Sequence, residues 1–344
     1  MARYWVGGAT GFLGSRLVES LLQQGHEVVP VSSSGGQVAG LTVKRCDVLD
    51  ERQVAESAAG TAGAFLCTGK VSRDPADAEQ LFRLHVTGTK TALGGLRSAG
   101  VPRVVLASTS GTVAVGEDPD RIFTEADPAP ITLIGNWPYY RTKLYAEREA
   151  LARNEPGVFD VLCVNPSLLL GPGDVRQSST KDVRLFLERE IAAIPSGGMA
   201  FVDARDAANG MLLAMAKGRA GERYLLNAKN MTMAAFFERL SRVSGVPAPL
   251  LRVPRGRNVA LAAHRAMSGA LGWLGRKPAV DEVSVEMAQC YWYCDSAKAE
   301  RELGFTTRDP GDTLRETVDD LIERGAAFPR RGAPFETPKS RASL

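Results

Sequence analysis

The chain has 344 residues, of which 44% are hydrophobic, so it can fill the core of one large α/β domain or of such a domain with a smaller lobe. Its 42 basic and 39 acidic residues leave a net charge of +3, which argues against a nucleic-acid partner. Five cysteines without a CxxC pair and three isolated histidines provide no metal site and suit a reducing compartment. Residues 1–6 run directly into a glycine turn and leave no room for a secretory signal, so we expect a cytoplasmic protein.

Short apolar runs alternate with amphipathic stretches through the first half of the chain. This alternation is typical of a parallel sheet with helical crossovers, and the apolar runs are typical of strands buried on both faces. The predicted strands and the helices that follow them are 4–6 with 12–24, 28–31 with 51–59, 64–67 with 76–99, 104–107 with 138–153, and finally 161–164.

The second half of the chain is predicted to return to this sheet and to form a separate lobe. A strand near residue 201 is expected to rejoin the sheet, with a helix after it. We predict an α/β fold in which a doubly wound parallel sheet carries a smaller, mostly helical C-terminal lobe that binds substrate. The predicted limits are 1–170 with 196–228 for the nucleotide-binding domain, 171–195 with 229–330 for the lobe, and 331–344 for an extended tail.

The most apolar later segment, 259–275, is interrupted by His264 and Arg265 and is not a membrane span. We expect it to be an amphipathic helix of the lobe; a helix that lies on a membrane surface is the alternative.

Three glycines recur directly after the first strand. Gly8 permits a tight turn, Gly11 lets the backbone approach a pyrophosphate, and Gly14 lets helix and strand pack closely. The following helix presents free N–H groups and a partial positive charge at its N-terminus. This context predicts a Rossmann-type dinucleotide site and not only a structural turn.

The second strand ends at Ser32 and Ser33, where an NAD site often carries an acidic residue. Serine hydroxyls tolerate a 2′-phosphate, although no arginine adjoins them in the sequence, so NADP(H) is mildly favoured over NAD(H) and an ordinary serine turn is the alternative. Asp47 could accept from the adenine amino group or belong to a helix N-cap region.

Tyr139 and Lys143 lie four residues apart on a predicted helix, with Asn136 as its expected cap and Pro138 in its first turn. A phenol has a pKa of about 10, so it exchanges a proton near neutral pH only if a positive charge stabilises the phenolate. We predict Tyr139 as the acid/base, with Lys143 and a cationic nicotinamide lowering its pKa.

The remaining aromatic and hydroxyl residues near this pair are weaker candidates. Tyr140 and Trp137 are predicted substrate contacts, packing being the alternative for Tyr140, and Tyr145 is predicted to pack. Thr109 or Ser110, at the carboxyl end of the fourth strand, could hydrogen-bond the substrate oxygen, or could belong to a polar turn.

Several motifs occur together in one order. They are GGATGFLG at 7–14, TSGTV at 109–113, YYRTK at 139–143, NPSLLLGPGD at 165–174, FVDARDAANG at 201–210 and SAKAERELGF at 296–305. With these motifs the chain resembles the extended short-chain dehydrogenase/reductase (NAD-dependent epimerase/dehydratase) family, in particular its dihydroflavonol-reductase-like branch and the sugar-epimerase-like proteins associated with hopanoid genes.

The resemblance implies roles for individual residues. Tyr139 would be the acid/base, Lys143 would orient the nicotinamide ribose, and Thr109 would occupy the usual serine position, with Ser110 in reserve. The implied cofactor contacts are Gly8, Thr10, Gly11, Phe12, Leu13, Ser32, Ser33, Asp47, Val48, Cys67, Thr68, Gly69, Lys143, Pro166 and Ser167.

Three positions depart from the family pattern. Gly7 replaces a common threonine, and Cys67 replaces a small apolar residue and is expected to pack. His85 replaces the usual asparagine, and we expect a buried, hydrogen-bonded histidine, a changed proton relay being the alternative.

Members of this family catalyse several different reactions, so the fold alone does not fix the activity. Dehydration is disfavoured because no Asp-Glu pair follows Thr109, and the apolar and aromatic residues of 229–294 suit a weakly charged substrate. We therefore expect an NAD(P)H-dependent reductase of a ketone in a small or hydrophobic metabolite. A nucleotide-sugar epimerase and a non-catalytic dinucleotide sensor are the alternatives. An epimerase could hold a diphosphate with Arg184, Arg205, Arg252, Arg255 or Arg257. The resemblance also suggests a homodimer through helices in 76–99 and 138–153.

Overall fold

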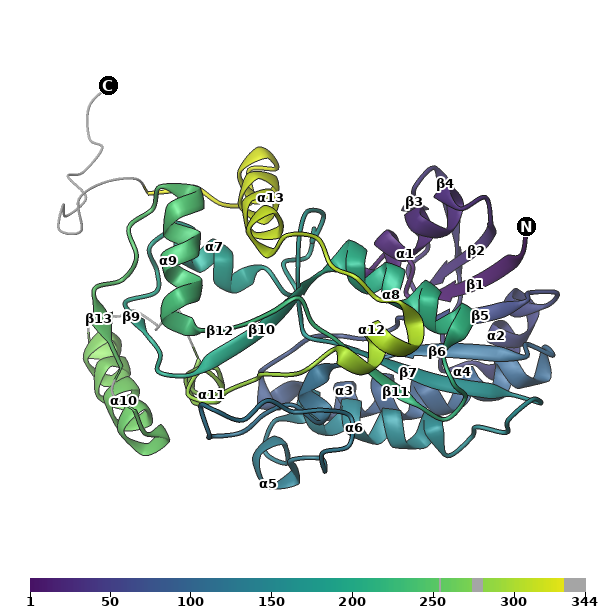
Figure 1. The fold of residues 1–344 in the computed structure, drawn as a ribbon, viewed down its shortest axis with the longest axis horizontal. Coiled ribbons are helices and arrows are strands. Elements are labelled where there is room, and N and C mark those ends of the chain that lie inside the picture. Colours follow the sequence, from purple (N-terminus) through teal and green to yellow (C-terminus); the bar gives the residue numbers. More distant parts are fainter. Residues whose placement is uncertain (254, 274–280, 331–344) are drawn as a thin grey trace.

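The computed structural model describes residues 1–253, 255–273 and 281–330 (Figure 1). Within these residues, the central sheet has eight strands in the order β11-β7-β6-β5-β1-β2-β4-β3. Neighbouring strands are parallel except for the β3–β4 hairpin, which confirms the predicted parallel sheet. The strands are β1 (Arg3–Gly7), β2 (Glu27–Ser32), β3 (Gly36–Val38), β4 (Leu41–Arg45), β5 (Gly63–Leu66), β6 (Arg103–Ala107), β7 (Asp160–Pro166) and β11 (Arg223–Leu226).

Helices cover both faces of this sheet. Successive residues of a strand point to opposite faces, so Val105 of β6 joins the core under α1 and α8, whereas Val104 and Leu106 join the core under α2 and α4. The covering helices are α1 (Phe12–Gln23), α8 (Ala204–Lys217) and α12 (Ala297–Leu303) on one face, and α2 (Glu51–Ala58), α4 (Gly88–Ser98) and α6 (Pro138–Leu151) on the other.

The lobe at the other end of the molecule contains short strands as well as helices (Figure 1). Its three-stranded sheet has the order β12-β10-β8, and a second small sheet pairs β13 with β9. The elements are β8 (Leu168–Leu170), α7 (Lys181–Leu187), β9 (Ala193–Ile194), β10 (Gly198–Asp203), β12 (Lys229–Thr232), α9 (Met233–Ser244), β13 (Leu251–Arg252), α10 (Arg257–Trp273), α11 (Glu282–Met287) and α13 (Pro310–Glu323).

The strand expected near residue 201 does not rejoin the central sheet. It is β10, the middle strand of the lobe's sheet, and its Phe201 packs in the lobe core beside Phe236. The chain returns afterwards, through α8 on the face of the central sheet and β11 at its edge.

Two predicted helices differ in detail. The stretch predicted as one helix over 76–99 is divided into η1 (Pro75–Asp77), α3 (Ala78–Phe82), a π-helical turn η2 (Arg83–Thr87) and α4. The cap expected at Asn136 is also wrong, because α6 begins at Pro138 with Trp137 as its N-cap and without a side-chain cap. The short elements α5 (Ile131–Ile134) and η3 (Ser110–Thr112) precede α6.

Among the described residues, no helix is both long and apolar enough to cross a membrane. The predicted tail over 331–344 lies outside these residues.

Candidate active site

The three glycines form a close turn between β1 and α1. Gly8 has φ +75°, and a Cβ on it would lie 2.8 Å from the backbone of Cys67, while a Cβ on Gly14 would overlap the carbonyl oxygen of Gly8. The cap of α1 is Gly11, with no side-chain cap and no acidic residue in the first turn. The free N–H groups of this helix end therefore fit a pyrophosphate.

Gly7 leaves room for an aromatic ring. A Cβ at this position would overlap the indole of Trp5, which is fully buried and donates its N–H to the Ser57 hydroxyl. This packing accounts for the glycine where the family commonly has threonine.

An arginine stands beside the serines at the end of β2, contrary to the expectation from sequence. Ser32 is buried and donates to the Gly35 carbonyl, whereas Ser33 is exposed. Arg45 of β4 lies opposite Ser32 of β2 in the parallel pairing of these two strands. A Cβ on Gly35 would lie 3.1 Å from the Arg45 Cγ. The β3–β4 hairpin brings Arg45 back over this turn.

The loop before α2 is organised by two aspartates. The Asp47 carboxylate accepts from the Leu49 N–H at 3.0 Å, and Asp50 is the N-cap of α2, accepting from Gln53 N. Asp47 is therefore not the cap; it is exposed, whereas Val48 is buried against Gly88.

Lys143 is buried on α6, and its ammonium donates to the Ala107 carbonyl oxygen at 2.9 Å. A Cβ on Gly69 would lie 3.4 Å from the Lys143 Nζ, so the ammonium lies between the end of β6 and the loop after β5. Burial lowers the pKa of Lys143 to about 8.

Tyr139 is half-buried one turn before Lys143. Its ring meets those of Tyr140 and His85 edge-on, with centroid distances of 5.0 and 5.7 Å. Burial, followed by the neighbouring Tyr140 phenol, raises the pKa of Tyr139 above its usual value. In the protein alone burial outweighs any effect of Lys143, whose ammonium donates to the Ala107 carbonyl; that Lys143 and a bound cationic nicotinamide together lower this pKa stays a prediction.

His85 is a buried, hydrogen-bonded histidine, as expected. Its Nε2 accepts from the Lys70 backbone N–H at 3.1 Å, so Nδ1 carries the proton toward the Thr142 Oγ1 at 2.9 Å. Burial, and then the Lys143 charge, lower the pKa of His85 to about 3, so the ring stays neutral. Placed in the π turn η2, it ties the loop after β5 to α6.

The hydroxyl candidates lie at the end of β6. The Thr109 Oγ1 accepts from Gly111 N at 3.4 Å as the cap of η3, and Thr109 is half-buried. Ser110 follows it and is 5% exposed. Both residues lie at the carboxyl end of β6, where η3 contacts α6.

A buried carboxylate, Glu147, was not singled out from the sequence. It is fully buried one turn after Lys143, and it gathers hydrogen bonds from three segments of the chain. Its partners are the Ser108 Oγ at 2.6 Å, the Thr112 Oγ1 at 3.1 Å and the Asn165 Nδ2 at 2.6 Å on one oxygen, and the Arg223 guanidinium at 3.1 Å on the other. The sequence carries a signal for Glu147, because Tyr139, Lys143 and Glu147 follow one another at four-residue intervals and so share one face of the helix.

Aromatic rings lie beside the hydroxyl loop. Tyr140 packs over Gly111, where a Cβ would overlap its ring, and lies 4.8 Å from the Trp292 ring. Trp137 stacks on Trp292 at 5.6 Å but is only 2% exposed, so it supports the other two rings and offers little surface of its own. Tyr145 is 42% exposed, and its predicted packing role is wrong.

Arg73, also missed from the sequence, joins the loop after β5 to the lobe. Its guanidinium pairs with the Asp182 carboxylate of α7 at 3.0 Å and donates to the Ser284 hydroxyl of α11 at 3.0 Å. These contacts cross between the two ends of the molecule.

The remaining predicted contacts are placed as follows. Burial raises the pKa of Cys67 to about 12, and its sulfur lies 3.8 Å from that of Met211, which agrees with a packing role. Pro166 and Ser167 are buried at the end of β7. In the part of the chain that the structure describes, no cluster of His, Cys, Asp or Glu could hold a metal ion.

Replacement of Glu147 by alanine is expected to lower the free energy of unfolding by about 3–5 kcal/mol, because it leaves the Arg223 charge and three buried donors without their acceptor. Urea denaturation measures this difference. The matched control is Glu149→Ala, which removes a partly exposed pair with Arg153 and should cost less than about 1 kcal/mol. Equal losses in the two variants would contradict the structural role of Glu147.

Comparison with known proteins identifies relatives over nearly the whole chain. Residues 4–226 match the model of the "NAD dependent epimerase/dehydratase family". The chain is 32% identical to a "Putative dihydroflavonol 4-reductase" of Synechocystis over 93% of both chains, and 31% identical to "Sterol demethylase protein B" of Methylococcus capsulatus over 93% of this chain and 98% of that protein. It is 28% identical to a 3-beta-hydroxysteroid dehydrogenase of Mycolicibacterium neoaurum over 99% of this chain and 98% of that protein.

The fold is shared with solved structures. A nucleoside-diphosphate-sugar epimerase from Pseudomonas aeruginosa superimposes with a TM-score of 0.74 at 24% identity, covering 95% of this chain and 99% of the epimerase. This likeness concerns the fold alone. Together with the family match, the sequence relatives establish that the chain belongs to the NAD-dependent epimerase/dehydratase family of extended short-chain dehydrogenases/reductases and is an NAD(P)-dependent oxidoreductase.

Proposed function

We propose that the protein reduces a ketone of a small or hydrophobic metabolite, with Tyr139 as the proton donor. The observation that carries this proposal is geometric: half-buried Tyr139 lies one turn before the buried Lys143 on α6, which packs against the hydroxyl loop of Thr109 and Ser110. A protonated phenol is ready to act as an acid, which is the role that carbonyl reduction requires.

The cofactor's place follows from the glycine turn. The N–H groups around Gly11 would hold the pyrophosphate, and Lys143 and Gly69 would lie against the nicotinamide ribose. The reduced nicotinamide, when bound, supplies the hydride that adds to the carbonyl carbon.

The protein's own groups then act on the carbonyl oxygen. Tyr139 transfers its phenolic proton to that oxygen, so the ketone gains a hydride and a proton and leaves as the alcohol. Thr109 or Ser110 donates a hydrogen bond that orients the oxygen. The Lys143 ammonium nearby stabilises the phenolate left on Tyr139, as a fixed charge in a partly dry site.

The surroundings of this site favour a weakly charged substrate. Tyr140 and Trp292 offer aromatic surface beside the hydroxyl loop, which suits an apolar or planar molecule. Relatives include a 3-beta-hydroxysteroid dehydrogenase and a ketoreductase of a farnesylated quinoline oxide from Stigmatella aurantiaca, both named for lipophilic molecules.

A nucleotide-sugar epimerase is less well supported. Such an enzyme needs cationic groups for a diphosphate, yet Arg184 pairs with Glu188, and Arg205 pairs with Asp203 and Glu316. Arg252 and Arg255 are exposed, and the Arg257 side chain lies outside the described residues. A non-catalytic dinucleotide sensor would not need the buried Lys143 or the protonated Tyr139, so this alternative is also less well supported.

We propose NADP(H) as the preferred cofactor. Arg45 stands beside the Ser32–Gly35 turn, and the exposed Ser33 hydroxyl lies in the same turn. An arginine and a hydroxyl at the end of β2 can pair with a 2′-phosphate, for which a carboxylate would be repulsive.

Replacement of Tyr139 by phenylalanine is expected to lower kcat for ketone reduction by roughly 10²–10⁴-fold, because the proton donor is lost, while the cofactor Kd hardly changes. Reduced-nicotinamide absorbance with a panel of aliphatic, aromatic and steroid ketones measures the rate, and fluorescence titration measures binding. Tyr145→Phe, on the same helix but exposed, is the matched control. Near-normal turnover in Tyr139→Phe would rule out this acid. Conversion of a nucleotide sugar to its epimer without net cofactor consumption would replace reduction by epimerisation.

The pH dependence of reduction should follow Lys143. Its pKa of about 8 keeps the ammonium below that pH, and the raised pKa of Tyr139 keeps the phenol protonated throughout. We therefore expect kcat/KM to be level near pH 7 and to fall as the pH rises through about 8, because the neutral amine no longer stabilises the phenolate. A rate that rises through this range would contradict the assignment.

Replacement of Arg45 by glutamate should raise KM for NADPH by roughly ten- to a hundredfold, because a charge-assisted hydrogen bond is lost and a repulsive charge is gained. KM for NADH should change little in the same variant. If both values shift together, Arg45 serves the fold of the hairpin and not the choice of cofactor.

A further inference from the structure

Helix α10 carries apolar side chains on two opposite faces. Toward the lobe it buries Ala260 and His264, which are 2% and 8% exposed, and it packs against α11. On the other side, Val259 and Trp273 are 51% and 90% exposed, while Met267, seven residues after Ala260, is 45% exposed at the edge of the buried face. Small exposed residues separate them at the helical period, namely Ala262, Ala263 and Ala266. The outward face is therefore an apolar stripe, where a helix at a protein surface normally presents polar groups.

The segment before α10 extends this apolar surface. Leu250, just before β13, and Leu251, its first residue, are 70% and 67% exposed. Figure 1 shows β13 and α10 at the end of the molecule opposite the central sheet. We give the name α10 surface to seven exposed residues of β13, α10 and the segments beside them, namely Leu250, Leu251, Arg252, Arg255, Val259, Met267 and Trp273.

The sequence of the segment that carries this surface is basic. Residues 239–280 include eight arginine and lysine residues and no aspartate or glutamate, although the whole chain has a net charge of only +3. Arg252 and Arg255 are exposed, and neither forms an ion pair with any residue that the structure describes. Arg265 differs, because it pairs with Glu282 of α11.

We propose that the α10 surface docks on an anionic lipid bilayer. Exposed leucine, methionine and tryptophan side chains can enter the boundary between headgroups and acyl chains, where tryptophan is favoured, while neighbouring arginines pair with lipid phosphates. A second copy of the chain fits less well, since a two-fold contact brings the same surface of both subunits together, and the α10 surface includes two arginines and no carboxylate to pair with them.

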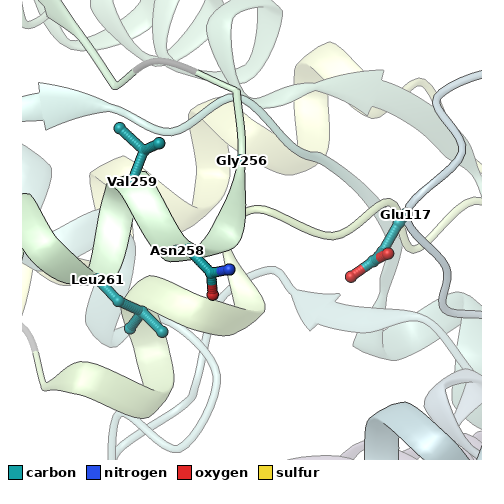
Figure 2. Close-up of a pocket in the computed structure, with 5 residues that line it drawn as sticks. All are labelled: Glu117, Gly256, Asn258, Val259 and Leu261. Carbon is teal, nitrogen blue, oxygen red and sulfur yellow. The ribbon is translucent and has the colours of Figure 1, made fainter.

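A cavity adjoins the α10 surface on the protein side. It has a volume of about 590 Å³ and is lined by Gly256, Asn258, Val259 and Leu261 on one side and by Glu117 on the other. Figure 2 shows the Asn258 amide and the Glu117 carboxylate directed toward each other across the gap. Glu117 follows Gly116, whose bridge to Tyr291 leads to the Trp292 ring beside Tyr140. The wall of the cavity at Glu117 is thus continuous along the chain with the segment that bridges to Tyr291.

Vesicle flotation tests the proposal with the full-length protein. One set of vesicles contains phosphatidylcholine alone, and a second contains phosphatidylcholine with phosphatidylglycerol. We expect flotation with the second set only, weakening as sodium chloride is raised, because salt screens the arginine–phosphate attraction. Absence of flotation with the anionic vesicles, or equal flotation with both sets, would overturn the proposal.

Variants locate the contact. The pair Met267→Ala with Trp273→Ala, and separately the pair Arg252→Glu with Arg255→Glu, should each reduce binding at least about tenfold. Matched controls elsewhere are Phe328→Ala, which is 70% exposed, and Arg148→Glu, which is also exposed; both should bind as the parent does.

Two further readouts separate the outcomes. Circular dichroism and cofactor binding should be unchanged in all variants, because every substituted side chain is exposed and distant from the glycine turn. Light scattering without lipid distinguishes a protein partner: a dimer that the Met267 and Trp273 changes abolish would assign the α10 surface to self-association and refute docking on lipid.

Discussion

The burial of the Glu147 carboxylate is the constraint on which the candidate site depends. A fully buried charge is stable only when its oxygens are paired and hydrogen-bonded, and here the partners come from the end of β6, from η3, from β7 and from β11. The same helix carries Lys143 one turn and Tyr139 two turns before it. The Glu147 carboxylate therefore helps to hold the helix that carries the two catalytic candidates against the hydroxyl loop.

A second set of contacts holds α6 from the opposite side. Neutral His85 joins the loop after β5 to Thr142, and Lys143 reaches back to the carbonyl of Ala107. The π turn at His85 supplies the extra residue that lets its ring reach this position. A buried, neutral imidazole, a lysine with a lowered pKa and a protonated phenol thus form one partly dry site, in which few groups titrate near neutral pH.

Residues outside the candidate pair Tyr139 and Lys143 bear on the choice of cofactor and on the charge of the substrate. Arg45 at the β3–β4 hairpin bears on the choice between cofactors, and the paired arginines of the lobe bear on the charge of the substrate. Arg73 links the two ends of the molecule through Asp182. If both proposals hold, the protein combines a site for a weakly charged ketone with a surface suited to the phase in which such molecules dissolve.

Local patterns were sufficient for part of this description. The glycine turn, the alternation of strands and helices and the i, i+4 spacing of Tyr139 and Lys143 depend on residues near one another in the chain, so the sequence alone determined the fold class, the dinucleotide turn and the catalytic pair to be tested. Other features depend on residues far apart in the chain. Only the tertiary structure placed β10 in the lobe, brought Arg45 to Ser32 and gathered four segments around Glu147. It also decided the direction in which the pKa of Tyr139 shifts, because that shift is set by burial and neighbouring groups, and neither is fixed until the chain has folded.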